Sequence, residues 1–316
     1  MKKIVLLLPL AVLLLWPNLS FGQAKVGTAG AQFLEIGVSA RAIGMGEAFL
    51  GVADDASALY YNPGGLSLLT QKEVIFTHID YPADIKYEYA GYVMPAPSIV
   101  GTLGFSFAML HMNDIDVTNY SAPRGTGQKY TSTDYAAGLT YSAGLTDRFS
   151  VGITAKYIRQ DLAGYSASGW AADLGTYYDT GFRNFKICMA IANFGPDMKF
   201  IADSYPLPID FRFGSAIDVI QSDNSRLVLS VQASHPNDNL EKYSAGAEYW
   251  FQEKYAVRIG KKFNYDFYDK GDAGGGLTFG AGLRLPFSSY RITADYAYQD
   301  LGYLDSVNRF SLGIRF

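Results

Sequence analysis

Three histidines are the residues of this sequence best suited to catalysis. A histidine acts as a general base when a nucleophile such as serine and an orienting carboxylate lie within hydrogen-bond reach. His78, His111 and His235 fall at or beyond the ends of predicted strands, and no serine and acid accompany them at a suggestive spacing. We therefore expect interfacial roles for the histidines, no catalytic residues and no enzyme activity.

Metal and phosphate binding are the other chemistries that the residue types could support. Aspartates in predicted outer loops could bind calcium or bridge lipopolysaccharide, but they lack EF-hand spacing and are better explained as solvated charges (Asp114, Asp116, Asp197 and Asp238). The glycine-rich stretch GDAGGGLTFGAG leads into a predicted strand, whereas a phosphate cradle opens a helix. Cys188 is the only cysteine, which excludes a disulfide framework and a cysteine-based metal site. The sequence thus predicts no metal and no cofactor.

Residues 1–22 have the three-part layout of a secretory signal peptide. Lys2 and Lys3 precede an apolar run over residues 4–16, and Ser20 and Gly22 supply the small residues of a cleavage site after Gly22. The run is too short for a membrane-spanning helix, which needs ~20 residues. The residue after the site is Gln23 rather than cysteine, so lipoprotein attachment is not expected.

The aromatic and glycine content separates this chain from most soluble proteins. It has 24 Tyr, 20 Phe and 33 Gly among 316 residues, and no apolar stretch beyond the signal peptide is long enough for a transmembrane helix. The formal net charge of −4 argues against nucleic-acid binding. An exported chain of this composition is typical of an outer-membrane β-barrel, whose strands need no continuous apolar run.

Strict alternation of apolar and polar residues supports a barrel. In RFSLGIRF, residues 309–316, the apolar residues fall on one face, as expected for a strand between lipid and a polar lumen (Phe310, Leu312, Ile314 and Phe316). Fourteen such segments follow residue 71, at 72–79, 86–94, 98–111, 131–145, 149–160, 167–178, 184–193, 208–220, 225–234, 241–251, 255–263, 274–285, 289–299 and 307–316. We predict an all-β, 14-stranded antiparallel transmembrane β-barrel over residues 72–316, surrounded by outer-membrane lipids.

The connections between these segments carry independent information. Long connections such as NFGPDMKFIADSYPL alternate with short ones such as TDR and QEK, as when outer loops are long and periplasmic turns are tight. A soluble β-sandwich, the alternative fold, has no reason to show this sidedness. The alternating apolar residues from Phe310 to Phe316 also resemble the C-terminal signal that the barrel assembly machinery reads.

The predicted lumen carries both signs of charge, which is typical of a filled interior rather than of an ion-selective pore. The residues assigned to it are Glu88, Asp134, Asp173, Asp210, Asp218, Glu248, Asp295, Lys86, Lys156, Lys186, Arg212, Arg258, Arg284, Arg291, Arg309 and Arg315. Residues 23–71 are the predicted filling, a short, partly helical hatch rich in small residues. We expect Arg41 to pair with Asp54, Asp55 or a lumen acid, and a short helix to end at Asn62-Pro63, where the chain turns into the wall.

The stretch from Phe33 to Leu66 closely resembles the N-terminal signature of the PorV/PorQ family, relatives of the FadL-type long-chain fatty acid transporters. The matches are Ala40-Arg41-Ala42, Gly44-Met45-Gly46, Ala48-Phe49, Ala53-Asp54-Asp55, Ser57-Ala58 and Asn62-Pro63, and Gly64 replaces the usual alanine. The candidate hatch residues are Phe33, Gly37, Arg41, Gly44, Met45, Gly46, Asp54, Asp55, Asn62, Pro63 and Gly64.

The resemblance implies two functions. PorV-type proteins act in type IX secretion and bind the C-terminal signal of exported proteins at the cell surface, whereas FadL-type proteins pass hydrophobic small molecules. The signature is closer to the PorV/PorQ branch, so we expect an adaptor for secreted protein cargo and type IX components, with a passive transporter of fatty acids or other hydrophobic molecules as the alternative. Candidate outer-loop contacts, which could equally form an interfacial girdle, are Phe200, Tyr205, Tyr265, Phe267 and Tyr268.

Overall fold

The computed structural model describes residues 26–263, 276–302 and 306–316. The expected signal peptide and three of the candidate loop aromatics lie outside these residues (Tyr265, Phe267 and Tyr268). The hatch, the wall strands and the other candidate residues lie within them.

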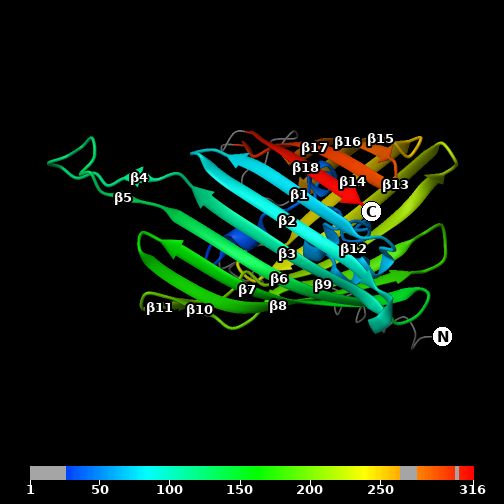
Figure 1. The fold of residues 1–316 in the computed structure, drawn as a ribbon, viewed down its shortest axis with the longest axis horizontal. Helices are drawn as coiled ribbons and strands as arrows, with labels where there is room; N and C mark the ends of the chain where they lie inside the picture. The colour runs from blue at the N-terminus through cyan, green and yellow to red at the C-terminus, as the bar shows by residue number, and fades with distance from the viewer. Residues whose placement is uncertain (1–25, 264–275, 303–305) are drawn as a thin grey trace, which may run out of the picture.

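Fourteen strands of the described chain form one closed antiparallel barrel, and β1 pairs with β18 to complete the ring. Figure 1 shows them running obliquely around the wall. Their bounds are β1 Glu73–Tyr81, β2 Ile85–Ala96, β3 Gly101–Met112, β6 Ser132–Gly144, β7 Phe149–Leu162, β8 Tyr165–Asp179, β9 Lys186–Phe194, β12 Asp210–Gln221, β13 Ser225–Pro236, β14 Lys242–Phe251, β15 Tyr255–Phe263, β16 Leu277–Phe287, β17 Tyr290–Asp300 and β18 Ser306–Arg315. The predicted fold is confirmed, and every predicted segment overlaps one of these strands, with bounds that differ by up to three residues.

In the described residues, two small hairpins stand outside the barrel sheet, in long connections. They pair β4 (Ile115–Asp116) with β5 (Lys129–Tyr130), and β10 (Met198–Phe200) with β11 (Asp203–Tyr205). The first projects well beyond the barrel (Figure 1). Because outer loops are long, we assign this end of the barrel to the cell surface and the opposite end to the periplasm. Two surface connections are nevertheless tight, at residues 82–84 and 163–164.

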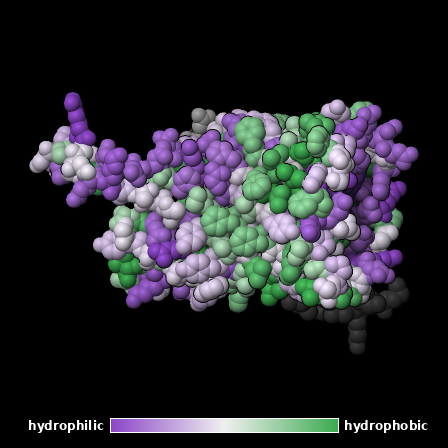
Figure 2. Space-filling model, viewed as in Figure 1, coloured by the Kyte–Doolittle hydropathy of each residue, from purple (hydrophilic) through white to green (hydrophobic). Residues whose placement is uncertain are grey.

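The outer face of the wall is apolar in its middle zone and hydrophilic at both ends (Figure 2). On β18, Phe310 and Leu312 are exposed on this face. The assignment of Lys86 and Glu88 to the lumen is wrong, because Tyr87 and Tyr89 are the buried, inward residues of β2. Tyrosine suits both faces of a barrel, so the alternation in this strand does not distinguish them.

The lumen is filled by the segment that precedes β1. It contains η1 (Gln32–Glu35), α2 (Ala40–Gly44), α3 (Ala58–Tyr61) and η2 (Pro63–Leu68). A further short helix, η3 (Pro97–Ile99), lies in the β2–β3 turn. No helix in the described residues is long and apolar enough to cross a membrane. As expected, α3 ends at Asn62, which is extended, but the chain does not turn into the wall there. Pro63 starts η2 instead, and the wall begins at Glu73.

This hatch runs along the whole lumen from the surface end to the periplasmic end. Near its start, the Gly27 amide donates to the Asp238 carbonyl in the β13–β14 connection, and the Gly30 amide donates to the Pro206 carbonyl. In the interior α2 packs on β15–β18, and η2 packs on β6–β8. At the far end the chain enters β1, and the Phe316 amide donates to the Lys72 carbonyl. The hatch therefore lies between the two mouths of the barrel.

Glycines on the wall allow the hatch backbone to touch the strands. A Cβ added to Gly260 on β15 would lie 2.0 Å from the Gly46 nitrogen, and one on Gly246 of β14 would lie 2.3 Å from the Met45 carbonyl oxygen. On the other side of the lumen, a Cβ on Gly152 of β7 would lie 2.3 Å from the Pro63 carbonyl carbon. Any side chain at these positions would push the hatch away from the wall.

We predict that Gly260→Ala lowers the temperature of barrel unfolding and loosens the hatch, because the added methyl group overlaps the Gly46 backbone. Overpacking of this kind costs about 1–3 kcal/mol. Heat-modifiable mobility on gels gives the unfolding temperature, and liposome swelling gives the leak of small solutes. Gly144→Ala is the matched control, because its nearest neighbour would be the Thr146 carbonyl at 3.7 Å. Equal unfolding temperatures for the two variants would contradict the proposed contact.

Candidate functional site

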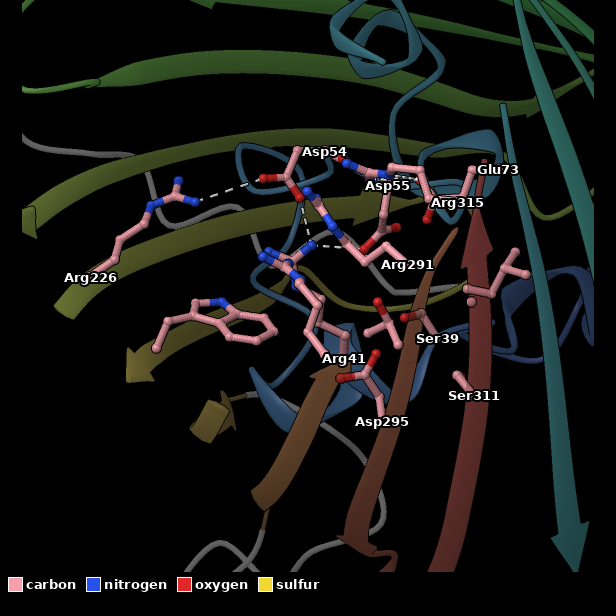
Figure 3. Close-up of a pocket in the computed structure, with 15 residues that line it drawn as sticks. Ser39, Arg41, Asp54, Asp55, Glu73, Arg226, Arg291, Asp295, Ser311 and Arg315 are labelled. Carbon is pink, nitrogen blue, oxygen red and sulfur yellow. Dashed lines mark hydrogen bonds and ion pairs between the residues drawn. The ribbon is translucent and has the colours of Figure 1, made fainter. Parts of the chain in front are cut away.

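Arg41 on α2 is the charged centre of the hatch. Its side chain is buried, and its Nε and Nη2 atoms both donate to Glu248 of β14, each at 2.8 Å. Its Nη1 atom donates to Asp54 at 2.6 Å and to Asp55 at 2.7 Å. The small residues Ala40, Ala42 and Gly44 let α2 lie close to the wall, so that the long Arg41 side chain reaches all three carboxylates. Figure 3 shows Arg41 joined to Asp54 and Asp55 within the hatch.

The ion pairs continue from Arg41 into the wall. Glu248 also accepts from Arg258 Nε of β15 at 2.7 Å, and Arg258 Nη1 donates to Asp295 of β17 at 2.7 Å. Breaking a buried pair by removing one partner typically costs 3–5 kcal/mol, because the other charge is left without compensation. This chain of charges therefore ties the hatch to strands β14, β15 and β17.

The charge of Asp54 is stabilised by the same contact. Burial by itself would raise the pKa of the Asp54 carboxyl, but the Arg41 guanidinium outweighs it and lowers the pKa from 3.8 to about 2. Burial likewise opposes ionisation of Glu47, and its ion pair with Lys262 of β15 outweighs burial and lowers the pKa of Glu47. Both hatch carboxylates are thus held ionised by cations facing them.

Asn62-Pro63-Gly64 forms a second attachment on a different part of the wall. The side-chain Nδ2 atom of Asn62 donates to the backbone carbonyls of Leu50 and Thr176, each at 3.1 Å. The side-chain oxygen of Asn62 accepts from the backbone amide of Gly64. The Gly64 carbonyl in turn accepts from Ser150 at 2.8 Å and from Ser142 at 3.3 Å. These bonds require that α3 ends abruptly at Asn62 and that residue 64 is small. This explains why the sequence Asn62-Pro63-Gly64 occurs here.

A cavity of about 570 Å³ opens above the hatch at the surface end. Its sides are mostly apolar, and they include Tyr81, Ile85 and Leu110. Its lower part is polar, with Arg309 donating to the Gly37 carbonyl at 3.1 Å and to the Tyr81 hydroxyl at 2.9 Å. The Arg309 Nε and Gln299 Oε1 atoms are buried there without a hydrogen-bond partner among the residues that the structure describes. The cavity can hold an apolar group with a polar end.

The remaining predicted residues take different places. Phe33 lies in the apolar core of the hatch, and Gly37 lines the surface cavity. Phe200 packs against the core, and Tyr205 is exposed and lies beside Gly30. Glu47 and Tyr81 also line the cavity, although neither was predicted as a site residue. Glu47 occupies a position of the hatch signature that has no fixed residue type, and Tyr81 lies just beyond the end of the predicted strand.

The histidines and acids form no metal centre in the part of the chain that the structure describes, where no group of three or more potential ligands is suitably placed. The His78 ring hydrogen-bonds Glu88 at 2.7 Å and contacts Asp80 at 3.2 Å, so both of its nitrogens face carboxylates rather than a nucleophile. His235 contacts Glu241 at 3.3 Å.

We predict that Arg41→Ala loosens the hatch, because it leaves Glu248 buried beside a single remaining arginine and leaves Asp54 and Asp55 without their closest cation. Single-barrel conductance in planar bilayers should become measurable and noisy, and the detergent-solubilised barrel should unfold at a lower temperature. Arg124→Ala, on the exposed connection between β4 and β5, is the control for loss of one positive charge. If the Arg41→Ala barrel shows no conductance, Arg41 does not hold the hatch.

The same contact predicts a pH dependence. A carboxyl whose pKa is lowered by folding stabilises the protein fully above its unfolded pKa, which is near 3.9 for aspartate, and loses this contribution as the pH falls toward its folded pKa. For Asp54 the loss falls between about pH 4 and about pH 2. The contribution of Asp54 to conductance should therefore stay constant from neutral pH to about pH 4 and appear as a rise in conductance below it. In Asp54→Asn this acid step should be smaller; an unchanged step would assign it to other carboxyls.

The comparisons with known proteins agree with this architecture. The family model described as Type IX secretion system protein PorV matches residues 20–236. The toluene transporter TodX of Pseudomonas putida has a similar structure, with a TM-score of 0.59 and 12% identity over 88% of this chain and 97% of TodX. The toluene transporter TbuX of Ralstonia pickettii gives 0.56 and 13% over 88% and 97%. A FadL homologue of Pseudomonas aeruginosa gives 0.50 and 12% over 86% and 97%.

These identities are low, so the three structures indicate a shared fold, that of FadL-like outer-membrane barrels, and not a shared ligand. No curated protein matches the sequence. The family match covers more than half of the chain and includes the hatch and strands β1 to β13. The chain therefore belongs to the PorV family of type IX secretion system proteins.

Proposed function

We propose that this protein is a closed outer-membrane barrel that acts as an adaptor at the cell surface in type IX secretion, where it binds exported protein cargo. The observation that carries the proposal is the double attachment of the hatch. Arg41 joins it to β14 through Glu248, and Asn62 joins it to β8 through the Thr176 carbonyl. A hatch held at two separate parts of the wall favours a scaffold over a gate.

On this proposal the working surface is the outer mouth, and the barrel serves as a membrane anchor. The β4–β5 hairpin stands clear of the membrane there (Figure 1), and Tyr120 in the connection between its strands is fully exposed. Its backbone is ordered by Asn119, whose side-chain oxygen accepts from the Ser121 and Ala122 amides at 3.0 and 2.8 Å. An ordered, projecting aromatic loses little conformational entropy on binding a protein partner.

A second candidate function is passive transport of a hydrophobic small molecule. The observation that favours it is the surface cavity of about 570 Å³, which has apolar sides and lies directly above the hatch. The similar structures named as toluene transporters support the same candidate. Transport would require the hatch to move, because the hatch lies between this cavity and the periplasmic end.

We predict that fixing the hatch by a disulfide separates the two functions. A Cβ on Gly51 would lie 3.0 Å from the Cβ of Ala216 on β12, so Gly51→Cys with Ala216→Cys can be bridged after a small shift toward the usual 3.5–4.5 Å. The background should carry Cys188→Ala, because Cys188 is a free, buried cysteine. Non-reducing gels show whether the bridge has formed.

Two readouts are then compared with and without reductant in cells that lack the native gene. An adaptor should deliver cargo with a C-terminal sorting domain to the cell surface equally well in both states. A transporter should take up labelled toluene or fatty acid only when the bridge is reduced. Uptake that depends on reductant, together with cargo delivery unchanged by deletion of the gene, would overturn the adaptor proposal.

A further inference from the structure

A second cavity lies on the opposite side of the hatch, toward the periplasmic mouth. It has a volume of about 100 Å³, the size of a small ion, and is bounded by the hatch and by strands β1, β13, β14, β16, β17 and β18. Ser39, Thr293 and Ser311 contribute hydroxyl groups to its lining. Figure 3 shows its charged side chains converging from the hatch and from several strands.

Arginines dominate this periplasmic cavity. Its lining includes Arg41, Arg226, Arg284, Arg291 and Arg315, against four carboxylates, Asp54, Asp55, Glu73 and Asp295. Most of these arginines already have an acidic partner. Arg315 pairs with Glu73 at 2.6 Å, Arg226 with Asp218 at 3.2 Å, and Arg284 with Glu253 at 3.0 Å. Asp295 forms an ion pair with Arg258, which does not line the cavity.

Arg291 of β17 is the exception. It makes no hydrogen bond or ion pair with any residue that the structure describes, although its side chain extends toward the centre of the cluster in Figure 3. An arginine presents five N–H donors in a rigid fork that matches a carboxylate or a phosphate. Arg291 therefore offers an unused anion-binding fork in a cavity whose lining has four other arginines and four carboxylates.

Arg284 lies beside it and is held in place. Its guanidinium stacks on the Trp250 ring at 4.0 Å, and a neighbouring cavity of about 270 Å³ is also lined by both Arg284 and Arg291. That outer cavity adds Lys254 from the β14–β15 turn. The two arginines thus separate an inner pocket from an entrance on the periplasmic face.

We propose that the periplasmic mouth of the barrel is a binding site for a small oxyanion, with Arg291 and Arg284 as the residues that bind it. Arg291 supplies two parallel N–H groups, Arg284 supplies a second positive charge fixed by Trp250, and Thr293 offers a hydroxyl donor. The bound group is a phosphate or a carboxylate, because a guanidinium fork recognises either. This site is independent of the adaptor proposal, since it lies at the other end of the barrel.

Inorganic phosphate is the first probe. Isothermal titration into the purified barrel in neutral phosphatidylcholine nanodiscs, with chloride at equal ionic strength as the reference, should show saturable binding near one site per barrel. Arg291→Gln should weaken the affinity at least about tenfold, as expected for loss of a bidentate charge-assisted contact. Arg148→Gln is the matched control, because Arg148 lies in the β6–β7 turn at the same end and outside the cavity.

A second experiment distinguishes a lipid headgroup from a soluble anion as the natural ligand. In it, phosphatidylglycerol is added to the nanodiscs. A lower apparent affinity for phosphate in that experiment identifies a lipid headgroup as a competing ligand, and an unchanged affinity identifies a soluble anion; both support the site. Heat-modifiable mobility verifies that each variant is folded, and Arg284→Gln gives a second test if Arg291→Gln misfolds. Absence of saturable binding above chloride, or equal binding by Arg291→Gln and Arg148→Gln, would overturn the proposal.

Discussion

The buried guanidinium of Arg41 is the constraint on which the interior depends. It has 3% relative exposure, and three carboxylates from two parts of the chain share its donors. An arginine at this depth is tolerated only if its charge is compensated by acidic partners. Glu248 is shared by Arg41 and Arg258, and Asp295 in turn pairs with Arg258. The hatch and the wall consequently form one network of ion pairs. The buried charges on strands β14, β15 and β17 are fully paired only when Arg41 of α2 is in place.

The position of the hatch also depends on a steric feature: glycines, which have no side chain, on both the hatch and the wall. Gly44-Met45-Gly46 meets Gly246, Gly260 and Gly280 on one part of the wall, while Pro63 and Gly64 meet Gly152 and Gly175 on another. Main-chain atoms of the hatch thereby lie against main-chain atoms of the barrel, and little space remains between them. A largely apolar cavity lies above this contact zone and faces the cell surface, and a charged cavity lies below it and faces the periplasm. The hatch thus divides the lumen into two chemically different compartments.

Strand positions could be predicted from the sequence because period-two alternation reports a real boundary between lipid and lumen. The same logic assigned fourteen of the sixteen proposed lumen charges to the inward face but failed for Lys86 and Glu88, where tyrosines occupy both faces of β2. The pairing of Arg41 with Asp54 and Asp55 could be expected from their proximity in the sequence, whereas Glu248 was one of several lumen acids. The β4–β5 and β10–β11 hairpins, the η2 turn after Asn62 and the position of Glu47 depend on tertiary contacts that no local pattern encodes.

The lengthwise course of the hatch has a consequence for the order of assembly. Gly27 contacts the connection at the surface end, and the same segment then continues through the lumen into β1, which closes the ring by pairing with the last strand, β18. The seam is therefore formed by the two strands most distant in the chain, and one of them is tethered to the hatch. Once β1 has paired with β18, this segment could reach the interior only by threading through one end of the barrel, past the loops there. The hatch must therefore be enclosed while the sheet closes. Its charged residues then pair with those of the wall before β1 and β18 complete the barrel.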